Sequence, residues 1–253
     1  MSNRRDFFNL TMTYRTDSDS VWPYGSFVRK PWPATDTETE QLVEVVGGKS
    51  KLVAWFVSNC ATPSRREVFA SELRQLIQVD VYGQCGQLKC QRENMGGEVG
   101  AGDASSCHRL LTNDYKFYLS LENSLCKDYV TEKFYGVMDN AIVVPIVLER
   151  KIVLGTVSDA ETARALNRSF IAADDFANVQ DLVSYLRYLD TNTTEYLRYF
   201  EWRKSFQIGP STQFAPGCRL CSVVRSRKEK RIDIRNWWVN EAGCHSFSEK
   251  TRS

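Results

Sequence analysis

Residues 52–82, LVAWFVSNCATPSRREVFASELRQLIQVDVY, alternate between apolar runs and one amphipathic stretch. Leu52–Val57 is continuously apolar, which is typical of a strand buried on both faces of a sheet. Val79–Tyr82 (VDVY) indicates a second short strand, closed by Gly83. Between them, Arg66–Ile77 has apolar residues at helical spacing, namely Val68, Phe69, Leu73, Leu76 and Ile77. We therefore expect a strand–helix–strand unit, whose length and handedness imply parallel strands.

The same alternation continues along the chain. Strands are predicted at Phe117–Leu121, Val143–Leu148 and Phe170–Ile171, and helices at Thr131–Asn140, near Val179–Leu189 and near Glu195–Phe206. This order predicts an open α/β sheet with helices on both faces. Ligands of such sheets bind outside the carboxyl ends of the strands. Residues 58–66 and 122–133 follow two of these strands and should lie at that edge.

Three stretches interrupt the alternation. Residues 29–50 are rich in proline and then acidic, and they predict a loop with at most a short helix. Residues 91–106 are rich in glycine and small polar residues, which indicates a mobile surface excursion. Residues 225–231, RSRKEKR, are typical of a solvated basic segment.

Charge and hydropathy argue against a nucleic-acid-binding surface and against a membrane-spanning segment. The formal net charge is only +2, which argues against a nucleic-acid surface held by bulk electrostatics but not against a local phosphate pocket. No run of about 18 apolar residues is present, so no segment of this sequence should span a membrane. The N-terminal residues MSNRRDFF lack the apolar core of a signal peptide, which by itself suggests a cytosolic protein.

Cysteines and sequons favour a secretory lumen instead. Asn9, Asn167 and Asn192 lie in N-x-S/T sequons and are candidate glycosylation sites. An even number of cysteines permits a set of disulfides, and they are Cys60, Cys85, Cys90, Cys107, Cys126, Cys218, Cys221 and Cys244. Cys218, Cys221, Cys244 and His245 could also be read as zinc ligands, but neighbouring Cys and His do not readily point at one tetrahedral metal. Disulfides are the preferred interpretation.

Two clusters of polar residues lie at the predicted sheet edge. In residues 123–133, NSLCKDYVTEK, the first turn of a helix and Lys133 could bind a phosphate, while amide and carboxylate groups could bind hydroxyls. The alternative is a well-capped helix with Asp128 or Thr131 as N-cap. In residues 59–66, arginines at a helix start oppose the helix dipole, so a nearby anion would explain them. Arg66 is preferred over Arg65 because it adjoins the predicted buried face.

Two further candidates for chemistry are weaker. Asp17-Ser18-Asp19 has the spacing of an Asp-x-Asp metal site, although such runs more often form turns. Histidine is an unfavourable choice of base, because the chain has only His108 and His245, and His108 is expected to lie in the glycine-rich excursion.

Several blocks resemble the α1,3-fucosyltransferases of glycosyltransferase family ten, in wording closest to invertebrate members. They are residues 8–25 (FNLTMTYRTDSDSVWPYG), 51–59 (KLVAWFVSN), 80–86 (DVYGQCG), 115–133 (YKFYLSLENSLCKDYVTEK) and 174–205, ending in YLRYFEWRKS. The resemblance implies a GT-B architecture, with two Rossmann-like domains and GDP-fucose held mainly by the C-terminal one. Fucose would be transferred with inversion by direct attack of an acceptor hydroxyl, usually of GlcNAc in an N-glycan core or a Lewis-type terminus.

The resemblance also assigns roles to residues. Arg66 and Lys133 would contact the diphosphate and stabilise the departing GDP, and Asn123, Tyr129 and Glu132 would surround ribose and fucose. Because GT-B enzymes do not hold their donor through Asp-x-Asp, no metal site and no required cofactor are expected, although Mn²⁺ stimulates some members. The family places a Cys-x-x-Cys here, which makes Cys218–Cys221 the expected disulfide.

The chain departs from the family pattern in two places. It starts almost at the FNLTM block, so the acceptor domain with its general-base glutamate, the stem and the membrane anchor are expected outside this sequence. The segment after VPIV has Glu149 where the family has glycine, and it lacks the usual prolines.

The expected organisation is a connecting segment (1–50), a Rossmann-like GDP-fucose-binding domain (51–208) and a cysteine-containing tail (209–253). The full-length form should be a type II membrane protein of the Golgi lumen. The alternative function is a catalytically impaired family member that only binds GDP-fucose.

Overall fold

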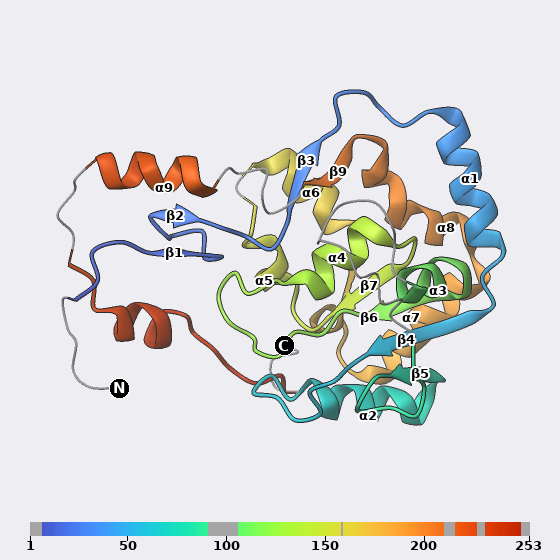
Figure 1. Ribbon diagram of the computed structural model, residues 1–253. Helices are drawn as coiled ribbons and strands as arrows, with labels where there is room; N and C mark the ends of the chain where they lie inside the picture. The colour runs from blue at the N-terminus through green and yellow to red at the C-terminus, as the bar shows by residue number, and fades with distance from the viewer. Residues whose placement is uncertain (1–6, 91–105, 158, 210–215, 227–230, 249–253) are drawn as a thin grey trace.

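The computed structural model describes residues 7–90, 106–157, 159–209, 216–226 and 231–248. Its centre is a five-stranded parallel sheet in the order β5-β4-β6-β7-β8 (Figure 1). The strands are β4 (Lys51–Phe56), β5 (Val79–Tyr82), β6 (Tyr115–Leu119), β7 (Val144–Val147) and β8 (Ile171–Ala172). The α/β fold with a parallel sheet is thus confirmed, with strand ends shifted by one or two residues.

Alternating side chains of the strands build a core on each side of the sheet. Val53 and Trp55 of β4 belong to a large apolar cluster that includes residues of α2 (Arg66–Leu76) and α7 (Val179–Thr191). Ala54, between them, belongs to a second cluster with residues of α3 (Ser106–Asp114) and α4 (Glu132–Asn140). Because both faces are covered, β4 can be continuously apolar.

The predicted helix α2 is confirmed, but the prediction that Val68 lies on its buried face is wrong. Phe69 and Leu73 are buried, whereas Val68 is 39% exposed. Val68 lies one residue before Phe69, so the helical turn of about 100° per residue carries it away from the sheet.

Two stretches are more helical than expected. Residues 29–50 contain α1 (Asp36–Gly47), which starts with a capping box in which Thr35 and Glu38 satisfy each other's backbone N–H groups. His108 lies in α3 and not in a loop, and burial lowers the pKa of its side chain.

The helix predicted near 195–206 is split into α8 (Thr193–Leu197) and the 3-10 helix η2 (Arg198–Lys204). Residues 91–105 and 227–230 of the other two interruptions lie outside the described residues.

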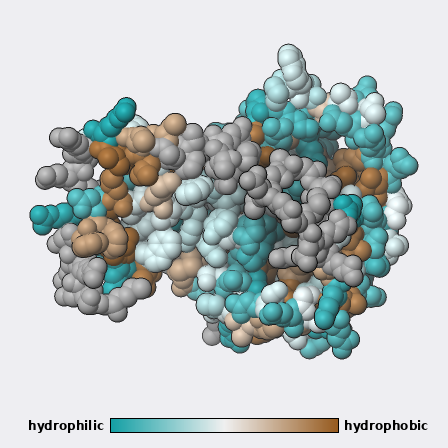
Figure 2. Space-filling model, in the orientation of Figure 1, coloured by the Kyte–Doolittle hydropathy of each residue, from teal (hydrophilic) through white to brown (hydrophobic). Residues whose placement is uncertain are grey.

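The segments before β4 and after η2 pair with each other. β3 (Ser26–Arg29) is antiparallel to β9 (Phe206–Gly209). A small parallel pair, β1 (Met12–Thr13) and β2 (Ser20–Val21), lies with α9 (Pro216–Arg225) to one side of the main sheet (Figure 1). Exposed apolar residues on this side include Phe7 and Val224, and Figure 2 shows apolar patches there beside a mostly hydrophilic main body. Helix α5 (Arg150–Leu154) follows β7, α6 (Ala160–Asn167) precedes β8, and the short η1 (Ala173–Asp175) follows β8.

Three disulfides are present among the described residues, and one of them ends on Cys107 in α3. They are Cys60–Cys85, Cys90–Cys107 and Cys126–Cys244. Cys218 and Cys221 are unpaired and exposed on α9, so the expected Cys218–Cys221 disulfide is wrong. The zinc alternative fails as well, because the sulfur of Cys244 is bonded to Cys126. Within the described ranges, no helix is both long and apolar enough to cross a bilayer.

Candidate functional site

Two polar loops meet at the carboxyl edge of the sheet, as predicted. The loop after β4 contacts the loop after β6 through Ser64, whose N–H donates to the carbonyl of Asn123 (3.0 Å). The Ser64 hydroxyl donates to the carbonyl of Glu122 (2.7 Å). These bonds bring Arg66 and residues 122–133 to one place.

Arg66 is a buried cation at the start of α2, only 3% exposed. Its guanidinium donates to the carbonyl of Leu121 (2.5 Å) and to that of Asn59 (3.0 Å), and so bridges the ends of two strands. Its Nε has no hydrogen-bond partner among the residues that the structure describes. Burial lowers the pKa of Arg66, and nearby Glu122 partly offsets this. A buried cation in this state would gain from an anion. Arg65 is exposed, so the choice between the two arginines agrees with burial.

Lys133 lies in the first turn of α4 among oxygen atoms. Its ammonium donates to Thr131 Oγ1 (2.9 Å) and Glu132 Oε1 (3.0 Å), and it lies 3.3 Å from Glu122 Oε2. Burial alone would lower the pKa of Lys133, but the two carboxylates outweigh burial and raise it. Lys133 is therefore a cation that a phosphate can reach, because its side chain is 23% exposed.

Thr131 caps α4, as one of the two open interpretations held. Its side chain accepts from the Lys133 N–H, and its own N–H donates to buried Glu122 (2.7 Å). Burial raises the pKa of Glu122. Thr131 and Glu122 already accept hydrogen bonds from N–H groups at the start of α4. An anion at this helix start would therefore bind to the ammonium group of Lys133 rather than to the backbone.

Of the other three residues, Glu132 pairs directly with Lys133, while Asn123 and Tyr129 lie in the same loop after β6. Asn123 Oδ1 is buried without a hydrogen-bond partner among the residues that the structure describes. Tyr129 is half-buried and packs its ring 5.2 Å from that of Tyr14, and burial followed by Glu122 raises its pKa. Burial acts to raise the pKa of Glu132, but the hydrogen bond from Lys133 lowers it overall. Tyr129 and Glu122 also line a small pocket at this edge.

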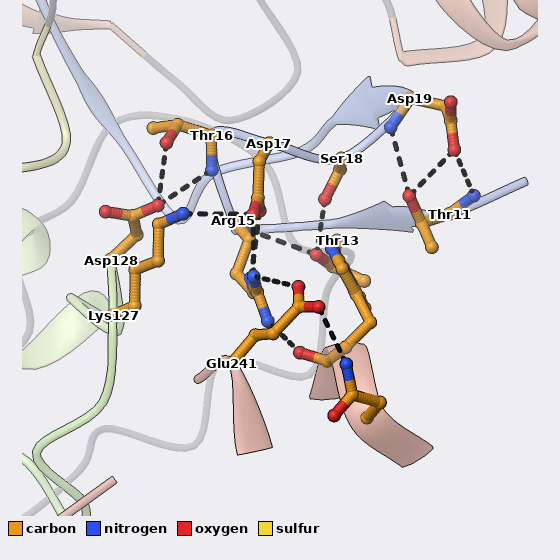
Figure 3. A network of polar contacts seen from close by, with 12 residues as sticks. Thr11, Thr13, Arg15, Thr16, Asp17, Ser18, Asp19, Lys127, Asp128 and Glu241 are labelled. Carbon is orange, nitrogen blue, oxygen red and sulfur yellow. Dashed lines mark hydrogen bonds and ion pairs between the residues drawn. The ribbon is translucent and has the colours of Figure 1, made fainter. Parts of the chain in front are cut away.

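Asp128 does not cap α4 but fixes the middle of the loop. It adopts φ +59°, a left-handed conformation that is rare for residues other than glycine. Its carboxylate accepts from Thr16 N (3.0 Å) and Thr16 Oγ1 (2.7 Å), as Figure 3 shows. The segment between β1 and β2 thus holds the loop after β6 in a strained conformation.

The two carboxylates of the Asp-x-Asp segment face different partners (Figure 3). Asp17 accepts from Arg15 (2.6 and 2.9 Å) and Lys127 (2.9 Å), and the hydrogen bond from Arg15 lowers its pKa to about 2. Asp19 accepts from the N–H (2.9 Å) and the hydroxyl (3.0 Å) of Thr11. This arrangement connects β1, β2 and the loop, and both carboxylates already have donors.

The three sequons differ in accessibility. Asn9 and Asn167 are exposed, although Asn167 Oδ1 accepts from Arg150 (2.7 Å). Asn192 is half-buried and caps α8, and its Nδ2 donates to the Tyr188 hydroxyl (3.2 Å). Asn9 is consequently the site best placed for a glycan.

Sequence comparison supplies the family. Residues 46–237 match the profile described as glycosyltransferase family 10 (fucosyltransferase), C-terminal part. The chain belongs to this family.

Known family members are similar along almost the whole chain. Alpha-(1,3)-fucosyltransferase fut-1 of Caenorhabditis elegans is 37% identical over 248 residues, covering 92% of this chain and 52% of the relative. Alpha-(1,3)-fucosyltransferase C of Drosophila melanogaster is 35% identical over 266 residues, covering 97% and 57%. The structural match to a crystal structure of an α1,3-fucosyltransferase covers 72% of this chain and 48% of the chain in that crystal structure, with a TM-score of 0.47 at 18% identity. The chain spans about half the length of the curated relatives it matches.

Sequence reasoning assigned no binding role at this candidate site to Glu122, Asp128 or His245. Glu122 bonds Thr131 and pairs with Lys133, and its place one residue before Asn123 in ENS was the available signal. Asp128 was considered only as a helix cap. His245 lies far along the chain from the other site residues and reaches the site through its contact with Glu149. No local sequence pattern indicates such a contact.

Proposed function

We propose that this chain supplies the GDP-fucose-binding half of an α1,3-fucosyltransferase that acts on a GlcNAc residue of a glycan with inversion. The observation that carries the proposal is the pair of cations, Arg66 and Lys133, at the carboxyl edge of a parallel sheet. Cofactors and nucleotides bind at that edge in open α/β sheets. The names of the family relatives, which are α1,3-fucosyltransferases, support the choice of sugar and linkage.

The chemistry follows from charge. An acceptor hydroxyl attacks the anomeric carbon of fucose, the bond to the phosphate oxygen breaks, and GDP leaves with an added negative charge. Lys133 and Arg66 would stabilise that charge in a site partly closed to water. Asn123, Tyr129 and Glu132 would bind hydroxyls of ribose and fucose. No residue of this chain is assigned as the base that accepts the acceptor's proton.

The proposed chemistry needs no metal cofactor, because the two cations already balance the diphosphate. We expect GDP binding to persist in EDTA, with Mn²⁺ as a stimulant at most. A large loss of GDP affinity in EDTA would contradict this part of the proposal.

The proposed location is the Golgi lumen, with the full-length form a type II membrane protein. The three disulfides support an oxidising compartment. Sensitivity of Asn9 to an N-glycosidase in the secreted chain would test this, and an unglycosylated chain with reduced cysteines would contradict it.

The central experiment is a calorimetric titration of the chain with GDP. Binding should be lost in Lys133→Ala and kept in Lys127→Ala, because Lys127 lies in the same loop but directs its ammonium at Asp17. The chain is then incubated with GDP-fucose and a chitobiose-core glycopeptide, and a mass gain of one deoxyhexose is sought. GDP binding without that gain favours a member that only binds the donor. Failure to bind GDP contradicts both functions.

A further inference from the structure

A segment near the end of the chain lies across the loops of the candidate site. We call residues 242–247 the C-terminal strap. The Lys127 N–H donates to the carbonyl of Ala242 (2.9 Å), and the His245 N–H donates to that of Leu125 (3.0 Å). The Phe247 N–H donates to the carbonyl of Ser64 (2.9 Å). The strap therefore bonds to the loop after β6 and to the loop that leads into Arg66.

Two further contacts fasten the strap. Cys244 is bonded covalently to Cys126 in the middle of the loop after β6. Phe247 is buried, and its ring packs edge-on against Phe69 of α2 at 5.5 Å between centroids. The strap is thus part of the core around the site and not a loose tail.

The side chain of His245 reaches a third strand end. Its Nε2 lies 2.6 Å from Oε1 of Glu149, the residue that joins β7 to α5. The Nδ1 atom lies 3.1 Å from the carbonyl of Gly243. Both ring nitrogens therefore face oxygen atoms, one of a side chain and one of the backbone.

Glu149 is a buried carboxylate with few other partners. Its side chain is 1% exposed, its Oε2 accepts no hydrogen bond among the described residues, and Lys151 Nζ lies 3.3 Å from that oxygen. Glu149 also lines the small pocket together with Glu122 and Tyr129. Removing His245 would leave a buried charge beside the site with only the exposed Lys151 nearby, which is costly.

We propose that Glu149 and His245 are positioning residues of the donor site. Their pair ties the strap to β7, and the strap in turn holds the loop of residues 122–131 in the shape that receives GDP. That loop needs holding because most of it is irregular and Asp128 is in a strained conformation. A loop fixed beforehand loses less entropy on binding, so its ligand binds more tightly. The inference rests on the proposed function, and the strap lies beyond the residues 46–237 that match the family profile.

The rival explanation is that the pair stabilises the fold and does nothing for the site. A matched control separates the two. Lys116 and Asp190 form an ion pair (2.7 Å) at the opposite edge of the sheet, with the lysine side chain 16% exposed. Alanine at either residue should lower the melting temperature without changing GDP affinity.

The experiment measures GDP affinity by calorimetry and the exchange of backbone amides in residues 122–131. His245→Ala and Glu149→Ala should each weaken GDP binding by about tenfold, the loss expected for one charged hydrogen bond. The double variant should be no worse than either single variant. His245→Gln keeps a donor at the same reach and should bind GDP within about twofold of the wild type.

The rate of backbone amide exchange in residues 122–131, measured without nucleotide, reports how firmly the loop is fixed. It should speed up in residues 122–131 of His245→Ala and stay unchanged in Lys116→Ala. Should His245→Ala not fold, Glu149→Ala carries the same comparison, because it removes the same contact from the other side. Wild-type GDP affinity together with unchanged loop exchange in the folded variants overturns the inference. A wild-type chain that fails to bind GDP instead overturns the proposed function. In that case unchanged exchange of residues 122–131 in His245→Ala would still refute the role of the strap.

Discussion

The disulfide between Cys126 and Cys244 spans 118 residues of sequence, the longest of the three spans found among the described residues. Replacing both cysteines by alanine should destabilise the chain strongly, because an open chain gains more entropy on unfolding. The chain-entropy relation gives about 5 kcal/mol for a loop of this length. The same relation gives about 3.5 kcal/mol for Cys60–Cys85, whose sequence separation is 25.

The assay is denaturant unfolding under non-reducing conditions, followed by a thermal melt. A loss of about 5 kcal/mol corresponds to a shift on the order of 10–20 °C for a chain of this size. The control is the double alanine variant of Cys218 and Cys221, which are unpaired and exposed and should change the free energy of unfolding by less than about 0.5 kcal/mol.

One result would refute the reasoning. If the Cys126/Cys244 variant unfolds within about 1 kcal/mol of the wild type, the strap is not held by this bond in solution. A larger effect for Cys60–Cys85 than for Cys126–Cys244 would show that loop length does not set the order of the two.

Three further predictions concern single residues. Arg66→Ala should abolish GDP binding and lower the free energy of unfolding by about 1–3 kcal/mol, because it leaves two backbone carbonyls without their donors. The exposed Arg65→Ala should change neither property. Equal effects of the two substitutions in a GDP titration and a thermal melt would contradict this prediction. Asp128→Ala should cost about 1–3 kcal/mol because it loses two hydrogen bonds and keeps the unfavourable φ, and a denaturation curve matching the wild type would exclude that role. Asp17 has a folded pKa of about 2, so its stabilisation is present above its ordinary pKa of 3.8 and is lost as pH falls towards 2. Asp17→Asn should therefore lower the melting temperature at pH 7 and have little effect near pH 2, and an equal shift at both pH values would argue against an ionic role.

Much of the sheet was predictable because its signals are local. Leu52–Val57 is apolar throughout, and a strand covered on both faces has no alternative composition. The phase of α2 also placed Arg66 inside and Arg65 outside, since Phe69 and Leu73 define the inward side. Helix α1 was underestimated because its start, Thr35 with Glu38, is a capping box within a stretch whose prolines suggested a loop.

The candidate site was predictable only in part. Residues 123–133 could be recognised because their polar groups follow a buried strand. The contributions of Thr16, His245 and Cys244 could not be predicted, because these contacts join residues that are 112, 96 and 118 positions apart in the sequence. Eight cysteines allow 105 complete pairings, so spacing alone does not select Cys126 and Cys244.

The bond between Cys126 and Cys244 also sets the order of events during synthesis. A ribosome makes chains from the N-terminus, so residue 126 emerges 118 residues before its partner. The β4, β5 and β6 strands can pair in that interval, but the loop that follows β6 must wait without its covalent anchor. Nucleotide binding should then mature last, after Cys244 has entered an oxidising compartment. Nascent chains halted before residue 244 would fold their sheet and still fail to retain GDP.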